Sequence, residues 1–111
     1  MHSPRFLSSL LIVGLMMSCQ SIAANQAALP ELALNNGCFT CHAIDRKVIG
    51  PAWRDVAAKY RGDANAEDRL VRKVSAGGKG VWGNEMAMPP FAPYMKEVDI
   101  RTLVKYVLSL K

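Results

Sequence analysis

The stretch Gly37-Cys38-Phe39-Thr40-Cys41-His42 decides how the rest of this 111-residue chain is interpreted. Two residues separate Cys38 from Cys41, and His42 follows directly, which is the C-x-x-C-H spacing of a c-type haem attachment site. One helical turn between the cysteines places both sulfurs along one edge, where each can form a thioether with a haem vinyl group. His42 can then turn its imidazole toward the iron, because neutral imidazole is a common iron ligand.

A redox dithiol and half of a zinc site are the other interpretations of this motif. Thioredoxin-like dithiols lie near a βαβ pattern, which the sequence lacks. Zinc requires four ligands, and the chain has no second Cys/His pair. The motif therefore predicts one covalent haem c with its iron, attached through Cys38 and Cys41 and ligated by His42.

The N-terminus has the layout of a secretory signal peptide. A short charged region with Arg5 precedes an apolar run, and small residues follow up to Ala23 and Ala24. We expect a signal peptide over residues 1–24 with cleavage near Ala23 or Ala24, and a haem domain over residues 25–111. Cys19 leaves two further interpretations open: it departs with the signal, or it becomes a lipidated anchor at the membrane.

Four helices are expected in the mature chain, and no stretch has the alternation of a strand. They span residues 27–36, residues 53–60, a segment that stops at Gly77, and residues 97–110. Apolar residues recur at helical spacing in each, and the clearest set is in the last helix: Ile100, Leu103, Val104, Val107 and Leu108. A mature chain this short buries a small core, so a haem would supply much of it. The fold class is therefore all-α.

Residues 79–93 form an apolar loop that is long for so small a domain, which is typical of functional loops. The loop contains Met86 and Met88, and Met95 follows it. His2 lies in the signal peptide, so a methionine sulfur is the expected sixth ligand of the iron, and such a ligand raises the potential. Met88 is favoured because Pro89 and Pro90 stiffen the chain after it, whereas a gap-filling role in the core is the ordinary one for a methionine.

The chain from about Ala27 to Lys111 resembles the short monohaem class I cytochromes c of bacterial respiratory chains. The segments that carry the resemblance are residues 37–45, 48–52, 55–60, 80–83, 88–90 and 103–111. It implies a class I cytochrome c fold with about four helices around one covalent haem, His42 and Met88 as axial ligands, and electron transfer in the periplasm.

The resemblance also implies roles for three further residues. Pro51 matches a proline whose carbonyl holds the proximal histidine, although the sequence alone also allows an ordinary turn role. Trp82 matches an indole that hydrogen-bonds a propionate, and Arg54 stands where a basic residue often does the same. The sequence departs from the family where the segment before Met88 is one residue longer, which keeps Met86 as an alternative ligand. It also departs at Phe91, where an asparagine often donates to the sulfur.

The predicted function is that of a periplasmic electron carrier and not of an enzyme. Its partners would be redox proteins that dock transiently, namely a donor dehydrogenase or cytochrome complex and an acceptor oxidase or reductase. Arg46, Lys47 and Lys79 are candidates for the docking rim. The chain has a net charge of +5, but its basic residues form no run with interleaved aromatic residues. Nucleic acid is therefore not an expected partner. Two alternatives stay open: a haem c subunit dedicated to a periplasmic dehydrogenase, whose docking patch would be Phe91, Pro93, Tyr94 and Met95, and an open-site haem enzyme or sensor.

Overall fold

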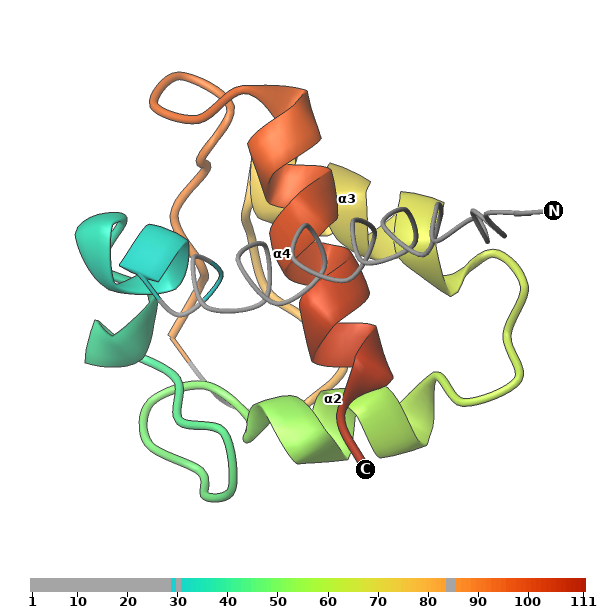
Figure 1. Cartoon of the computed structure of the whole chain (residues 1–111). Helices are drawn as coiled ribbons and strands as arrows, with labels where there is room; N and C mark the ends of the chain where they lie inside the picture. The colour runs from blue at the N-terminus through green and yellow to red at the C-terminus, as the bar shows by residue number, and fades with distance from the viewer. Residues whose placement is uncertain (1–28, 30, 84–85) are drawn as a thin grey trace, which may run out of the picture.

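The computed structural model describes residues 29, 31–83 and 86–111, and it is helical as predicted (Figure 1). A helical stretch covers residues 31–35. It is followed by the 3-10 helix η1 (Cys38–Thr40) and by the helices α2 (Trp53–Lys59), α3 (Ala66–Ala76) and α4 (Glu97–Ser109). Two isolated β-bridges are the only extended pairings within these residues, so the all-α prediction is confirmed. The signal peptide predicted over residues 1–24 lies outside the described residues.

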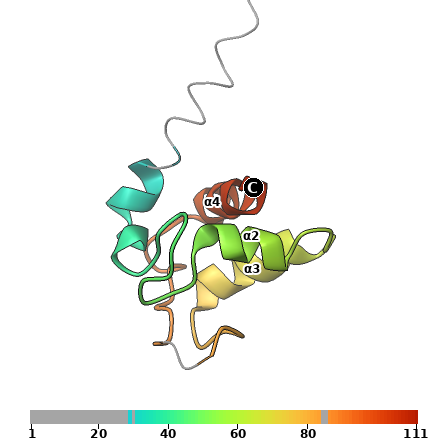
Figure 2. The ribbon, with the colours of Figure 1, turned by 90° about the horizontal axis from the view of Figure 1, so that it is seen from below.

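Helix α4 packs against both α2 and α3, which lie together on one side of it (Figure 2). Ile100, Leu103, Val104 and Val107 recur at the spacing that puts them on one face, and all four are buried. The helix ends at Ser109, one residue before the predicted end, because Leu110 adopts extended backbone angles. None of the described helices is long and apolar enough to cross a membrane.

The other helices contribute shorter apolar faces to the same core. Helix α2 buries Trp53, Val56 and Ala57, and α3 buries Ala66 and Val71. The predicted bounds of α2 and the predicted end of α3 hold to within one residue, since Tyr60 is the C-cap of α2 and Gly77 that of α3.

The first predicted helix is described only over its second half. There Ala33 is completely buried in the same cluster as Ile100 of α4. The Leu32 carbonyl accepts both from the Asn36 side chain, at 2.8 Å, and from the Asn36 amide, at 3.3 Å, which closes the last turn of this helix. Gly37 then takes a left-handed conformation with φ of 71°, which reverses the chain into η1.

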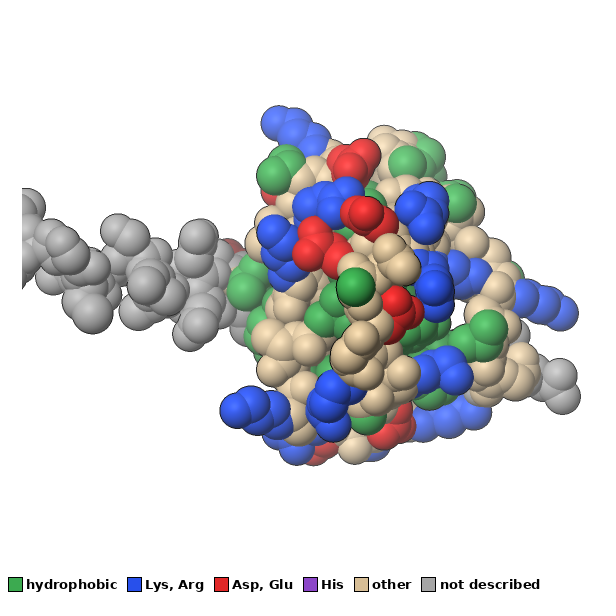
Figure 3. All heavy atoms as spheres, turned by 90° about the vertical axis from the view of Figure 1, so that its right-hand side faces the viewer, with side chains coloured by type: hydrophobic (Ala, Val, Ile, Leu, Met, Phe, Trp, Pro, Cys, Tyr) green, Lys and Arg blue, Asp and Glu red, His purple; other side chains and the backbone are tan. Residues whose placement is uncertain are grey.

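A cluster of charges joins the start of α3 to α4. The Arg101 guanidinium donates to Glu67 and to Asp68 at 2.8 Å each, and to Glu97 at 3.1 Å. The guanidinium holds the pKa of the Asp68 carboxyl below its ordinary value. Elsewhere charges are mixed, and Figure 3 shows basic and acidic side chains interleaved over one face of the molecule.

Candidate haem-binding site

The C-x-x-C-H motif forms a compact turn at the start of the described chain. The Cys41 amide donates to the Cys38 carbonyl at 3.2 Å, and the His42 amide donates to the same carbonyl at 3.0 Å. This single turn holds the two cysteines and the histidine in fixed relative positions. Figures 1 and 2 both place the turn on the same side of α4 as the segment that carries Met88.

Both cysteines are free thiols and both are half-buried. Burial raises the pKa of the Cys38 thiol, and the charge on Cys41 would raise it further. Reactive redox cysteines have the opposite property, a lowered pKa, so the Cys38 thiol does not resemble the attacking thiol of a redox dithiol. Within residues 29, 31–83 and 86–111, no three His, Cys, Asp or Glu side chains gather to hold a metal ion. This donor set does not fit a zinc site.

The imidazole of His42 is oriented by the backbone of Pro51. The distance between Nδ1 of His42 and the carbonyl oxygen of Pro51 is 2.8 Å. A carbonyl oxygen can only accept, so Nδ1 carries the proton and donates it. The other ring nitrogen, Nε2, therefore keeps its lone pair and is the nitrogen available to a metal. Two thiols one turn apart beside an imidazole in this tautomer fit a covalent haem and its iron.

The loop between His42 and α2 folds back beneath the imidazole. The amides of Ile49 and Gly50 both donate to the Cys41 carbonyl, at 3.1 and 2.7 Å. A Cβ atom added to Gly50 would lie 2.5 Å from Cε1 of His42 and 2.9 Å from its Nδ1. The imidazole therefore lies directly against the backbone, and only glycine leaves room for it there.

Residues 88–92, here called the Met88 segment, are held against the end of α3 by backbone hydrogen bonds. The Met88 amide donates to the Gly78 carbonyl at 3.1 Å, and the Gly78 amide donates to the Met88 carbonyl at 2.8 Å. Three residues further on, the Phe91 amide donates to the carbonyl of Val74 at 3.1 Å. The half-buried Met88 therefore has a fixed backbone position beside α3.

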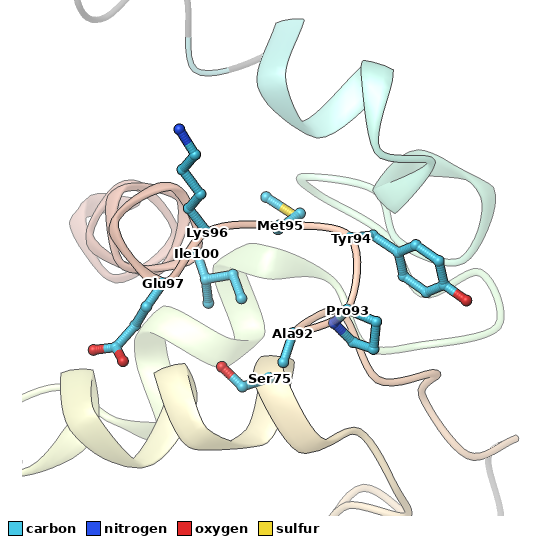
Figure 4. Close-up of a pocket in the computed structure, with 8 residues that line it drawn as sticks. All are labelled: Ser75, Ala92, Pro93, Tyr94, Met95, Lys96, Glu97 and Ile100. Carbon is cyan, nitrogen blue, oxygen red and sulfur yellow. The ribbon is translucent and has the colours of Figure 1, made fainter.

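The other two methionine candidates lie in different environments. Met86 is 74% exposed. Met95 is only 7% exposed and belongs to the core cluster, next to the start of α4 (Figure 4). Since a sulfur in the core is occupied by packing and Met86 points into solvent, Met88 is the methionine best placed to be a ligand.

The apolar patch considered for a dedicated subunit is only partly available on the surface. Tyr94 is 80% exposed and points away from the other labelled residues in Figure 4. Phe91 is half-buried, however, and Met95 is buried. Two of the four residues therefore serve the core.

The two residues predicted to bind propionates have different surroundings. Trp82 is half-buried, and the Lys59 ammonium lies 5.4 Å from the centre of its ring. Arg54 is exposed at the start of α2. Within the described part of the chain neither the indole nor the guanidinium hydrogen-bonds another residue, so both remain available as donors. Their propionate roles stay predictions.

One part of the site was not anticipated from the sequence. The Trp53 ring lies 5.0 Å from the ring of Phe39 and 6.1 Å from that of His42, and Tyr106 meets it edge-on at 6.2 Å. Because Trp53 is buried, it links the C-x-x-C-H turn to α4. Helical periodicity placed Trp53 in the core but could not show which aromatic rings it would meet.

Comparisons with known proteins agree with this geometry. The sequence model of the cytochrome c family matches residues 28–111. Cytochrome c-551 of Allochromatium vinosum is 47% identical over 93 residues, which cover 84% of this chain and 97% of that protein. Cytochrome c-551 of Pseudomonas aeruginosa is 43% identical over 97% of this chain and 98% of its own length.

A solved structure shows the same fold. The crystal structure of cytochrome c552 from Nitrosomonas europaea matches with a TM-score of 0.68 and 39% identity, over 74% of this chain and 99% of that chain. The match of the family over the whole described chain, the shared fold and the C-x-x-C-H turn lead to one conclusion. The chain belongs to the cytochrome c family, as a small class I cytochrome that carries electrons with one covalent haem c.

Proposed function

We propose that this cytochrome carries single electrons between redox proteins of the periplasm, with Nε2 of His42 and the sulfur of Met88 as the two axial ligands. The observation that carries the proposal is the hydrogen bond from Nδ1 of His42 to the Pro51 carbonyl, because it leaves Nε2 free for the iron. When bound, the haem supplies a one-electron redox centre whose potential depends on its axial ligands and its surroundings.

The residues around the haem would attach it and keep its axial ligands in fixed positions. Cys38 and Cys41 would form the two thioethers, and the Pro51 carbonyl would keep the imidazole from rotating. Met88 would need little rearrangement between the two oxidation states, since its backbone is paired with Gly78 and two prolines follow it. Such a site favours rapid electron exchange over binding and turnover of a substrate, so we propose a carrier and not an enzyme.

The axial pair is tested by Met88→Ala beside Met86→Ala. In the oxidised protein, a weak far-red sulfur-to-iron absorption band reports methionine ligation. We expect Met88→Ala to lose that band, to lower the reduction potential and to bind carbon monoxide when reduced, whereas Met86→Ala keeps the properties of the native protein. A far-red band that survives in Met88→Ala but disappears in Met86→Ala would assign the ligand to Met86.

The partner surface that we propose lies around the C-x-x-C-H turn. Val48 and Ile49 are 44% and 40% exposed, although both are apolar, and the Ile49 amide is bonded to the Cys41 carbonyl. The exposed Arg46 stands beside them, 3.8 Å from the carboxylate of Asp45. A small apolar patch with a basic edge fits a transient encounter with a redox protein that carries an acidic rim.

This surface is tested by Arg46→Glu, with Arg61→Glu as a control of equal charge change. Arg61 is exposed in the loop that follows α2. Figures 1 and 2 show this loop on the side of the molecule away from the C-x-x-C-H turn. We expect Arg46→Glu to slow electron exchange with an acidic redox protein several-fold at low salt, with the difference disappearing at high salt. Equal rates for the two variants would argue against a docking surface at this turn.

A free carrier is distinguished from a dedicated subunit by its size in solution. We expect the mature protein to elute as a monomer, both alone and in periplasmic extract of the source organism. Elution of most of the haem with a larger dehydrogenase would instead support the subunit interpretation.

A further inference from the structure

The C-terminal end of α3 and the Met88 segment are joined along their length. In the last turn of α3, the Lys73 carbonyl accepts a hydrogen bond from the Gly77 amide at 2.8 Å. The Val74 carbonyl accepts from the Phe91 amide at 3.1 Å, and the Ser75 carbonyl accepts from the Ala92 amide at 3.2 Å. The paired hydrogen bonds between Gly78 and Met88 continue this contact. Three carbonyls at the helix end thus have a partner, two of them in the segment that follows Met88.

Gly77 lies at the closest point of this contact. Its φ of 67° and ψ of −156° belong to a region that only glycine adopts readily. A Cβ atom at this position would lie 2.4 Å from the carbonyl oxygen of Met88 and 2.7 Å from the backbone carbon of Pro89. These are backbone atoms next to two prolines, so they cannot yield by a change of rotamer.

We propose that Gly77 is a positioning residue that sets where the Met88 sulfur lies relative to the iron. This inference rests on the proposed role of Met88 as the axial ligand. The absent side chain lets the Met88 backbone approach the end of α3, and the hydrogen bonds of Phe91 and Ala92 fix the register. Any bulk at residue 77 displaces the Met88 carbonyl and, with it, the side chain on the same residue.

The end of α3 is a firm support for this purpose. The helix is joined to α4 near its start by the Arg101 cluster and along its length by Val71, which is buried in the core. A displacement at Gly77 is therefore taken up by the Met88 backbone, which is held to α3 by hydrogen bonds, and not by the helix.

The test compares Gly77→Ala with Gly78→Ala. Gly78 also has a positive φ, of 100°, but its added Cβ would meet only the flexible Lys73 ammonium, at 3.7 Å. Both variants carry backbone strain, and only Gly77→Ala collides with the Met88 backbone. The readouts are the far-red band of the oxidised protein and carbon monoxide binding to the reduced protein, both measured well below the melting temperature.

We expect Gly77→Ala to lose the band and bind carbon monoxide while its helical circular dichroism is retained, and Gly78→Ala to keep the band. A native band in Gly77→Ala, or equal loss in both variants, would overturn the proposal. If Gly77→Ala does not fold, Ala92→Pro removes one hydrogen bond to α3 at the second position of the turn formed by residues 91–94, where proline is tolerated. A weakened band in that variant supports the proposal, and an unchanged one contradicts it.

Amide exchange separates this inference from the proposed ligand. If Met88→Ala keeps the native band, then Met88 is not the ligand and the proposed function fails in that respect. The placement of the segment is still measurable, because Gly77→Ala should speed exchange at the Phe91 and Ala92 amides at least tenfold relative to Gly78→Ala. Equal exchange in the two variants would refute the positioning role whichever ligand the iron has.

Discussion

Gly50→Ala is the substitution whose effect follows most directly from a single contact. Gly50 does not have a positive φ, so alanine is compatible with the backbone at this position. Its Cβ, however, would lie 2.5 Å from Cε1 of His42. The imidazole must move, and its hydrogen bond to the Pro51 carbonyl must lengthen or break.

The expected magnitude combines three terms. Overpacking a dense site costs about 1–3 kcal/mol, and leaving a polar group without its partner costs about 1–3 kcal/mol. Replacing glycine by alanine where the backbone allows it stabilises the folded protein by about 0.4–1 kcal/mol, because the unfolded chain loses conformational entropy. At the middle of these ranges the net loss is roughly 3 kcal/mol, which lowers the melting temperature of a domain of this size by about 12–24 °C.

The assay is thermal and denaturant unfolding of the haem-loaded protein, together with a redox titration. Gly80→Ala is the matched control, since Gly80 also lacks a positive φ. Its Cβ would lie 3.3 Å from Cδ1 of Trp82 and 4.0 Å from Cε of Lys73, and it would not contact His42. Weakening the bond from Nδ1 lowers the basicity of the imidazole, so the potential of Gly50→Ala should rise. A Gly50→Ala protein as stable as the native one, with an unchanged potential, would refute the reasoning.

Two further substitutions test the core and the charge cluster. Trp53→Ala should lower the free energy of unfolding by about 3–5 kcal/mol, because it removes a buried ring that joins the haem-binding turn to α4; a loss below about 1 kcal/mol in urea unfolding would contradict the packing described. Arg101→Gln should destabilise the protein at pH 7, where Asp68 is ionised. Since Arg101 lowers the pKa of Asp68 below its ordinary value of 3.8, this stabilisation is complete above that pH and is lost as the pH falls through the lowered value. The difference between native and variant should therefore shrink in unfolding measured near pH 3, and a constant difference at both pH values would argue against the pair.

Local patterns were sufficient to predict the helices. The spacing of Ile100, Leu103, Val104 and Val107 predicts one buried face of α4, and the structure buries all four. The end of α3 at Gly77 was also expected, since glycine commonly ends helices. These features depend on residues within a few turns of one another, so the sequence contains the information directly.

The tertiary role of the same glycines could not be derived in this way. Gly77 was interpreted only as a helix stop, whereas the structure places it against the Met88 backbone. The sequence gives Gly50 no role of its own, whereas the structure places it directly under His42. Both contacts join a glycine to a separate segment of irregular backbone, and helical periodicity does not report such contacts. A glycine in a short motif beside a proposed ligand is the signal that could have indicated them.

The surface showed a similar limit. Hydrophobicity makes Phe91, Pro93, Tyr94 and Met95 candidates for a docking patch, although covering the haem is the role that the sequence favours. The structure separates them, because the hydrogen bonds from Tyr94 and Met95 to the Phe91 carbonyl form a turn that directs Met95 into the core and Tyr94 into solvent. Hydrophobicity alone does not distinguish these two outcomes.

The central claim is that one haem is bonded to Cys38 and Cys41 of the mature chain, and intact mass spectrometry in denaturant tests it most directly. The protein would be produced in a host that has the haem-attachment machinery and then unfolded. The account predicts a single species in which one haem stays attached to a chain cut near Ala23 or Ala24, and loss of that haem from the Cys38→Ala, Cys41→Ala double variant. A native chain whose mass lacks the haem, or whose haem separates from it in denaturant, would contradict the account.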